Sequence, residues 1–224
     1  MNKLFVVATP IGNLEDITIR AIKTLLNVPV IACEDTRHTG QLIKILETRY
    51  SQYLTPNPSP NLGEGKHRFI SVRDWNEAGQ IEKILIELGK SDVALVSDAG
   101  TPLISDPGYK LVNIVRTAGF EVVPIPGASA LTTALSAAGL PTNKVVFWGF
   151  YQDKYILDFE ATNVFYESPT RLDKTLRILK EKYPRAEIVI ANEMTKIHER
   201  FLKSEELVNI RGEITMLVSF DRKK

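Results

Sequence analysis

The densest group of reactive side chains follows the apolar residues 28–33. Glu34, Asp35, Arg37 and His38 stand together there, where the pattern changes from strand to helix. A structural explanation is available, because Asp35 or Thr36 can cap the helix while Arg37 pairs with a carboxylate. A cap alone does not require four ionisable groups in five positions. The spacing therefore also predicts a site at which a carboxylate accepts a proton or an arginine holds an anion.

A second group, residues 97–108, follows another fully apolar run. The start of the next helix accounts for Asp106 as its N-cap and Pro107 as its first residue. It leaves residues 98–101, Asp-Ala-Gly-Thr, without a structural role. Small side chains at such a turn allow the backbone to approach a ligand closely. We therefore expect a ligand-binding loop here.

Two further turns have free backbone N–H groups at a helix start. Residues 9–16 form a Pro/Gly turn that can hold an anion or a ribose, but they lack the second and third glycines of a dinucleotide fingerprint. Residues 126–130 open a helix of small residues, with Ser129 as an N-cap or a ligand contact. Leu131 stands where a nucleophile elbow needs glycine, which excludes a hydrolase serine.

The second half of the chain adds fewer candidates. Ser168 and Pro169 are explained as the start of a helix, whereas Tyr166, Glu167 and Arg171 beside them are not. His198 has no partner spaced for catalysis and is interpreted as a surface residue. No spaced set of metal ligands is present, so we expect no metal site.

Alternating strand and helix patterns must position these groups, which indicates parallel strands joined by crossover helices. Strands are expected at 4–8, 28–33, 69–72, 93–97, 120–124, 145–149, 163–166 and 187–191, and helices at 17–26, 36–46, 76–88, 107–118, 128–138 and 170–181. Residues 200–203 and 213–220 are expected to form a closing antiparallel pair, and 47–68 a surface loop. The fold class is α/β, with two α/β domains, residues 1–122 and 123–224, and a ligand cleft between them.

Composition limits the classes of partner. The chain has 224 residues, with 28 Lys and Arg against 27 Asp and Glu, for a net charge of +1. A protein that binds RNA through general charge usually carries a basic excess, so any nucleic-acid role must depend on a local site. The single cysteine, Cys33, favours a reducing cytoplasm. The uncharged residues 122–143 contain proline and glycine breakers, and we expect no membrane span.

In order and content, these loops resemble the tetrapyrrole (corrin/porphyrin) methylase superfamily. The resemblance lies in residues 7–19, 32–39, 94–108, 123–141, 164–172 and 193–199. It is strongest to the branch that methylates the ribose 2′-oxygen of a decoding-region cytidine in 16S rRNA of the 30S subunit. The resemblance implies two α/β domains of the tetrapyrrole methylase type, a homodimer, and S-adenosylmethionine bound in the cleft between the domains.

The resemblance also assigns roles to residues of this chain. The implied cofactor contacts are Ile11, Gly12, Ala99, Gly100, Thr101, Ile104, Ser129, Ala130, Tyr166 and Asn192. Methyl transfer to a hydroxyl needs a group that accepts the proton, and Asp35 or Asp98 is favoured as nearest to the cofactor loops. The residues expected to bind substrate are Glu34, Arg37, Asn76, Glu167 and Arg171, with Arg37 and Arg171 on RNA phosphate.

The chain departs from its relatives at positions that bear on the substrate. Relatives usually carry Tyr-His-Glu-His-Asn where this chain has Val-Arg-Asp-Trp-Asn at residues 72–76, and commonly His where Thr170 stands. Residues 151–161 replace a longer basic segment. Two alternative functions stay open: a methyltransferase of the same fold that acts on a tetrapyrrole or another small molecule, and a cofactor-binding, ribosome-associated protein without turnover.

Overall fold

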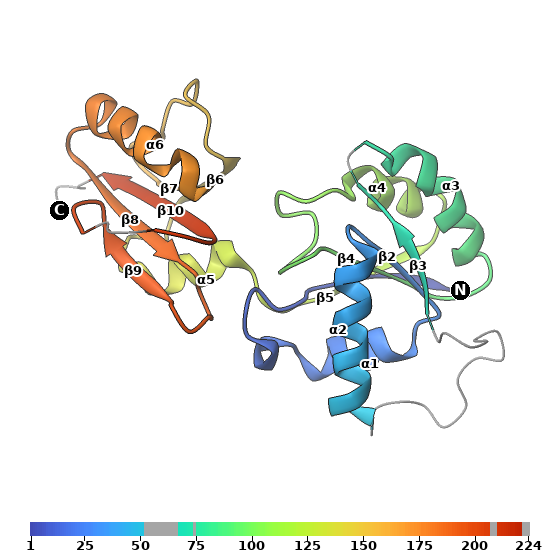
Figure 1. Cartoon of the computed structure of the whole chain (residues 1–224). Coiled ribbons are helices and arrows are strands. Elements are labelled where there is room, and N and C mark those ends of the chain that lie inside the picture. The colour runs from blue at the N-terminus through green and yellow to red at the C-terminus, as the bar shows by residue number, and fades with distance from the viewer. Residues whose placement is uncertain (52–66, 74, 207–209, 221–224) are drawn as a thin grey trace. The chain divides into compact units, whose positions relative to one another are not determined.

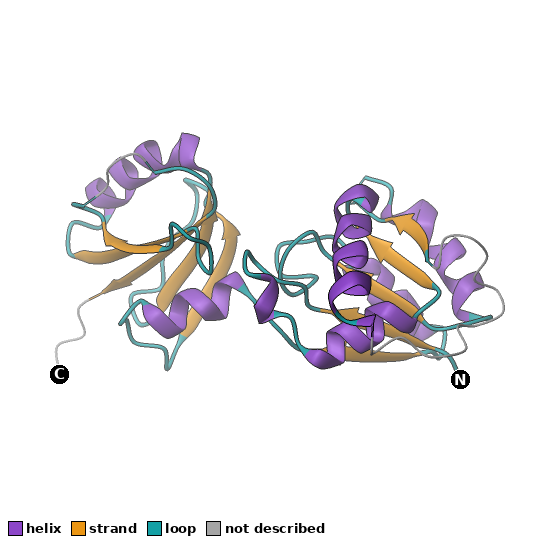
Figure 2. Ribbon diagram, turned by 60° about the horizontal axis from the view of Figure 1, so that its bottom comes forward, coloured by secondary structure: helices purple, strands orange, loops and turns teal. Residues whose placement is uncertain are grey.

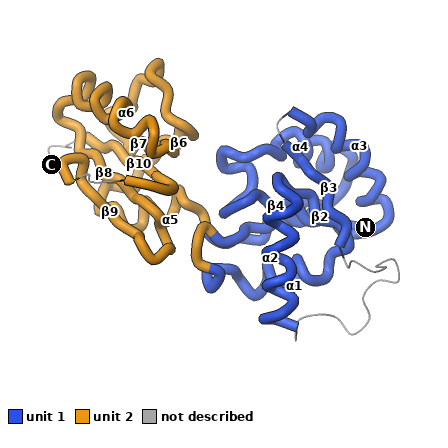
Figure 3. Tube along the Cα trace, viewed as in Figure 1, with its two compact units in different colours: residues 1–10, 14–128 blue, residues 11–13, 129–224 orange. Residues whose placement is uncertain are grey.

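The chain forms two compact units. A computed structural model describes residues 1–51, 67–73, 75–206 and 210–220 (Figure 1). The first unit comprises residues 1–10 and 14–128, and the second comprises residues 11–13 and 129–224 (Figure 3). The chain thus changes unit three times, after residues 10, 13 and 128.

The first unit is built on a five-stranded parallel sheet. Its strands are β1 (Lys3–Val7), β2 (Val30–Cys33), β3 (Arg68–Ser71), β4 (Val93–Val96) and β5 (Glu121–Ile125). They lie in the order β3-β2-β4-β1-β5, and every adjacent pair is parallel. The connecting helices are η1 (Leu14–Asp16), α1 (Ile19–Asn27), α2 (Thr36–Arg49), α3 (Glu77–Leu88) and α4 (Tyr109–Thr117).

Helices cover both faces of this sheet (Figure 2). One core joins α1 and α2 to alternate strand residues such as Ile31 and Val96. The other core joins α3 and α4 to the intervening residues such as Ala32 and Leu95. The inner strands are buried on both faces, which is why β2 and β4 are fully apolar.

The second unit has a mixed five-stranded sheet. Its strands are β6 (Val145–Phe150), β7 (Thr162–Glu167), β8 (Ala186–Asn192), β9 (Arg200–Lys203) and β10 (Ile214–Phe220), in the order β6-β7-β10-β8-β9. Helix α6 (Pro169–Lys182) packs Leu172, Leu176 and Leu179 on Met216 and its neighbours. Helix α5 (Ala130–Ala137) also contacts β10. β10 is therefore a buried central strand.

The expected α/β fold, with parallel strands and crossover helices, is confirmed. The predicted antiparallel pair of 200–203 with 213–220 is wrong: β9 and β10 both run antiparallel to β8, which lies between them. β10 is buried along almost its whole length rather than alternating, because it lies in the centre of the sheet.

Some expected boundaries also differ. Helix α4 begins at Tyr109 with Gly108 as its N-cap, so Asp106 does not cap it and Pro107 is not its first residue. The backbone of Gly108, at φ 122°, makes the turn into the helix. The expected junction between residues 122 and 123 lies inside β5, which pairs along its length with β1. Of the expected loop 47–68, residues 52–66 lie outside the described part of the chain, while 47–49 continue α2.

No helix in the described residues is long and apolar enough to cross a membrane.

Candidate active site

The connections of the first sheet create a topological switch point at its carboxyl edge. β2 leads into α2 on one face, whereas the adjacent β4 leads into α4 on the other. Ligands of open α/β sheets bind where neighbouring connections diverge in this way. The loops that meet this edge follow β1, β2 and β4, and they carry most of the first-unit candidates.

Asp35 lies at the end of β2 and caps helix α2. Its Oδ1 accepts hydrogen bonds from the backbone N–H groups of Arg37 (2.8 Å) and His38 (3.4 Å). The Arg37 guanidinium pairs with the same carboxylate, at 3.0 Å from Nη2 to Oδ2. The hydrogen bond from the Arg37 side chain is the main reason why the pKa of Asp35 is held well below its usual range. Asp35 therefore stays ionised and is strongly stabilised as a carboxylate.

Asp98, at the end of the neighbouring strand β4, is brought against Asp35. Its Oδ1 accepts the backbone N–H of Asp35 at 3.0 Å. Its Oδ2 has no hydrogen-bond partner among the described residues. The structure thus brings the two candidate bases together in the first unit, but in different surroundings.

Backbone hydrogen bonds join the loops after β1 and β4. Thr9 donates to the carbonyl of Gly100 at 2.9 Å, and Gly100 donates to the carbonyl of Thr9 at 3.1 Å. The Ser97 hydroxyl adds contacts to the carbonyls of Ala99 and Gly100, at 3.3 and 3.4 Å. Gly100 has φ 82°, a conformation that favours glycine. These contacts fix the Ala99–Gly100 turn at the switch point.

The rest of this loop has an unusual backbone. Leu103 and Ser105 both have positive φ, at 72° and 69°. Non-glycine residues adopt this region at a cost, and such residues concentrate at ligand sites. The Thr101 hydroxyl donates to the carbonyl of Ala128 at 2.9 Å, and Ile104 is half-buried. Sequence analysis identified this loop but not its backbone conformation.

In the second unit, the loop after β8 holds residues 11–13. The Thr195 hydroxyl accepts the backbone N–H of Asn13 at 3.1 Å. A Cβ on Gly12 would lie 2.6 Å from Cγ of Lys196, so only glycine fits there without movement of that side chain. Ile11 is buried and Gly12 is exposed. Close packing on the side chains of Thr195 and Lys196 thus explains Gly12.

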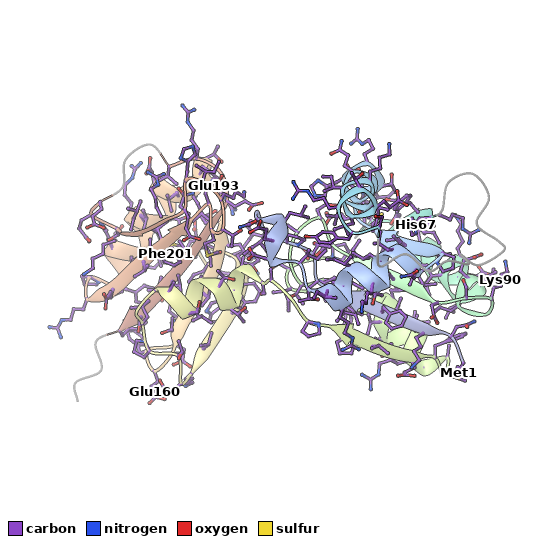
Figure 4. All side chains as sticks on the ribbon, turned by 90° about the horizontal axis from the view of Figure 1, so that it is seen from below. Met1, His67, Lys90, Glu160, Glu193 and Phe201 are labelled. Atoms are coloured by element: carbon purple, nitrogen blue, oxygen red, sulfur yellow. The ribbon has the colours of Figure 1, made fainter. Side chains whose placement is uncertain are left out.

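An ion cluster stabilises this supporting loop. Lys196 Nζ lies 2.9 Å from Glu193 Oε1 and 3.0 Å from Glu213 Oε2. Glu193 Oε1 also accepts the backbone N–H of Glu213 at 2.9 Å, and this bond is the main cause of the lowered pKa of Glu193. Figure 4 labels Glu193 in the second unit. The sequence pattern at 193–199 does not indicate Thr195 and Lys196 as supports, because Asn13 and Gly12, which they contact, are distant in the chain.

The other second-unit cofactor candidates differ in how freely they can reach a ligand. Ser129 is buried at the N-cap position of α5 without a side-chain cap bond, and Ala130 is the first residue of that helix. Tyr166 is half-buried, with its ring edge-on to Phe147. Asn192 is fully buried: its amide donates to the carbonyls of Arg211 (2.8 Å) and Glu213 (3.0 Å) and accepts from Arg200 (2.8 Å). Its side chain is committed to its own unit.

The expected substrate residues are mostly engaged within the protein. Glu167 is buried, and its carboxylate accepts from Ser168 N–H (2.8 Å) and the Thr175 hydroxyl (2.6 Å) and pairs with Arg171 (2.6 Å). Asn76 supports a turn, with its Oδ1 accepting the Arg73 N–H at 2.7 Å. Glu34 is half-buried, and its carbonyl accepts from Nε of Arg73 at 3.1 Å. Of this set, Arg37 and Arg171 present exposed guanidinium groups.

Arg73 was not among the sequence candidates. Its Nη2 lies 4.0 Å from Asp35 Oδ2, so Asp35 faces two arginines. Only the position of residues 72–76 after an expected strand could have indicated it.

His198 is exposed, as expected. In the described part of the chain, no group of three or more His, Cys, Asp or Glu residues could hold a metal ion.

Comparison with known proteins gives the family. A family model described as Tetrapyrrole (Corrin/Porphyrin) Methylases matches residues 3–207. Two relatives named "Ribosomal RNA small subunit methyltransferase I" are similar along their length. The one from Hydrogenobaculum sp. is 43% identical, with 97% of this chain and 95% of that protein covered. The one from Thermotoga maritima is 41% identical, with 100% and 94% covered.

Solved structures of low identity share the fold. Uroporphyrin-III-C-methyltransferase from Thermus thermophilus has a TM-score of 0.67 at 19% identity, over 98% of this chain and 94% of that one. A structure of uroporphyrin-III C-methyl transferase from the same organism, complexed with S-adenosyl homocysteine, has a TM-score of 0.63 at 16% identity, over 98% and 97%. Together with the relatives, these matches show that the chain belongs to the tetrapyrrole (corrin/porphyrin) methylase family and, within it, to the ribosomal RNA small subunit methyltransferase I group.

Proposed function

We propose that this chain transfers a methyl group from S-adenosylmethionine to the ribose 2′-oxygen of a cytidine in the decoding region of 16S rRNA. The observation that carries the proposal is the switch point of the first sheet. A carboxylate pair, Asp35 and Asp98, lies there beside a loop of small residues with a constrained backbone. Relatives that are 41–43% identical to this chain are named "Ribosomal RNA small subunit methyltransferase I", which supports the proposal.

The residues present suit a nucleoside cofactor. Ala99 is exposed, Gly100 has no side chain, and both follow a buried strand at the switch point. Small residues in such a loop let a ligand approach the backbone closely. We propose that Ala99, Gly100, Thr101 and Ile104 of the first unit bind S-adenosylmethionine. Ile11, Gly12, Ser129, Ala130, Tyr166 and Asn192 of the second unit stay predicted cofactor contacts; Asn192 would act through its backbone because its amide is already committed.

When bound, S-adenosylmethionine would supply a methyl group attached to a positively charged sulfur, which leaves as a neutral thioether when a hydroxyl oxygen bonds to the methyl carbon. The protein must accept the proton that the ribose hydroxyl loses as its oxygen reacts. Asp98 suits this role better than Asp35, since Asp98 Oδ2 has no hydrogen-bond partner among the described residues. The lowered pKa of Asp35 makes it a weaker base. We therefore propose Asp98 as the base, with Asp35 positioning Asp98 and Arg37.

Substrate binding is assigned to the exposed cations. Arg37 lies next to the carboxylate pair and can bind an RNA phosphate, as can Arg171 in the second unit. Glu34 and Asn76 support the site at Arg37 indirectly, because the Glu34 carbonyl and the Asn76 side chain both accept hydrogen bonds from Arg73. Glu167 supports Arg171 through their ion pair. We propose that the chain works on the 30S particle in the cytoplasm as a homodimer; sedimentation velocity of the purified chain tests its oligomeric state.

The test of this function is methyl transfer. Purified protein is incubated with S-adenosylmethionine labelled in its methyl group and with 30S subunits from a strain that lacks the mark. We expect label in 16S rRNA. Label in no RNA, from protein that binds the cofactor, would instead support a ribosome-associated protein without turnover. Label on an added tetrapyrrole would support the small-molecule alternative.

A further inference from the structure

Trp75 is a large aromatic side chain on the surface, with 79% of its area exposed. The chain has two tryptophans. The other, Trp148, is partly buried, stacks on Tyr155 and donates its indole N–H to Asn163 at 3.0 Å. A single exposed apolar residue needs no explanation by itself. The position of Trp75, four residues beyond the carboxyl end of β3 and directly before Asn76, is what gives it meaning.

The turn that carries Trp75 is fixed by its neighbours. Asn76 Oδ1 accepts the Arg73 N–H at 2.7 Å, and the N–H groups of Asn76 and Glu77 donate to the Arg73 carbonyl at 3.0 and 2.8 Å. Glu77 is buried, and its carboxylate accepts the N–H of Leu111 at 2.8 Å, which ties the start of α3 to α4. Hydrogen bonds therefore hold Arg73, Asn76 and Glu77 on either side of Trp75, which lowers the entropic cost of binding there.

Two arginines are held close to this turn. Arg73, two residues before Trp75, donates from Nε to the Glu34 carbonyl at 3.1 Å and lies 4.0 Å from Asp35. Arg37 pairs with the same Asp35 carboxylate at 3.0 Å, and 86% of its side chain is exposed. Asp35 thus orients guanidinium groups from the ends of two adjacent strands, β2 and β3.

An exposed indole two residues from an oriented arginine is typical of surfaces that bind unpaired nucleic acid. Bases stack on aromatic rings whatever their sequence, and arginine binds the phosphates between them. Glu34, Asp35 and Asp98 face the same sheet edge, so general charge attraction is weak here. Stacking does not depend on net charge, which agrees with a chain whose net charge is +1.

We propose that Trp75, with Arg37 and Arg73, forms a stacking platform for an unpaired base of the RNA substrate. The proposal rests on the proposed rRNA methyl transfer and adds the group that positions the RNA. Trp75 is a substrate-positioning residue, since nothing in its chemistry moves a proton or a methyl group.

Kinetics of methyl transfer test the platform. Trp75→Ala should raise KM for 30S subunits roughly tenfold, while kcat and the Kd for S-adenosylmethionine stay unchanged. Trp75→Phe should restore most of the affinity, because a phenyl ring also stacks. Ile86→Ala is the control for loss of an exposed apolar side chain: Ile86 is 52% exposed near the carboxyl end of α3, away from its start at Glu77, and its loss should change none of these constants. An unchanged KM for Trp75→Ala would overturn the proposal.

Fluorescence gives an independent readout. A Trp148→Phe variant leaves Trp75 as the sole tryptophan, so its emission reports on this site alone. Stripped, single-stranded 16S rRNA fragments from the decoding region should quench the emission, whereas a fully paired duplex should not. Quenching by whole 30S subunits but not by stripped RNA would assign the surface to a ribosomal protein and overturn the proposal. Wild-type protein that methylates no RNA would refute the proposed function, whereas active wild type with an unaffected Trp75→Ala variant would refute the platform alone.

Discussion

Two aspartates at the ends of neighbouring strands differ in what surrounds them. Asp35 accepts two backbone N–H groups and an arginine, whereas Asp98 accepts one backbone N–H. Both could be identified from the sequence, since each directly follows an apolar run. Their different roles could not, because the hydrogen bond from Asp35 N–H to Asp98 joins residues far apart in the chain.

The first prediction separates these roles. Asp98→Asn should lower kcat for methyl transfer by about 10²-fold or more, because general-base catalysis contributes that much, and leave cofactor affinity unchanged. Asp35→Asn should have the smaller effect on kcat, since an amide oxygen can still cap α2. Single-turnover rates with 30S subunits measure both. A larger loss for Asp35→Asn than for Asp98→Asn would reverse the assignment.

The second prediction concerns acid stability. The pKa of Asp35 is lowered in the folded protein, chiefly by its hydrogen bond from Arg37. A depressed pKa stabilises the fold above the unfolded value, about 4, and this stabilisation is lost as the pH falls below it. Asp35→Asn should therefore lose less stability than wild type between pH 5 and pH 3. Urea midpoints at both values test this, and parallel losses in the two proteins would contradict it.

At the scale of elements, the strands and crossover helices were predictable and the special loops were not. β2 and β4 are apolar because both faces are buried, and that pattern is visible in the sequence. The strands that pair with β10 could not be predicted, because a buried central strand has no alternation of polar and apolar residues that would indicate its place in the sheet. The positive φ angles of Leu103 and Ser105 also leave no sequence signal, because neither residue type favours them.

The third prediction uses two glycines with the same backbone conformation. Gly100 has φ 82° at the switch point, and Gly119 has φ 87° in the turn between α4 and β5, with nothing within 4 Å of an added Cβ. Alanine should destabilise the fold by about 1–2 kcal/mol at each position. Only Gly100→Ala should also weaken S-adenosylmethionine binding, by tenfold or more, as measured by calorimetry. Equal cofactor affinities for the two variants would argue against a cofactor role for the 99–104 loop.

At the scale of the whole molecule, a net charge close to zero means that RNA binding must depend on a few local cations. A net charge of +1 leaves local cations such as Arg37, Arg73 and Arg171 as the proposed phosphate contacts. The family, and with it the cofactor, could be predicted from the ordered loops along the chain. Arg37 and Arg171 were expected from the sequence to contact RNA phosphate, whereas Arg73 was not, because its approach to Asp35 joins residues far apart in the chain.

The fourth prediction follows from this charge. Three phosphate contacts should give a slope of about −2 to −3 for log K of RNA binding against log salt concentration. Binding to a decoding-region fragment at several KCl concentrations measures the slope. A slope steeper than about −6 would require a basic surface that the composition does not provide.

The central claim is ribose methylation of one cytidine in 16S rRNA. Its most direct test is nucleotide-resolution mapping of the methyl group after a single incubation of unmarked 30S subunits with the protein and labelled S-adenosylmethionine. We predict one new 2′-O-methyl group, on a decoding-region cytidine, that is absent with Asp98→Asn. A new methyl group on a base or on another nucleotide would contradict this claim, and so would the absence of any new methyl group in the RNA.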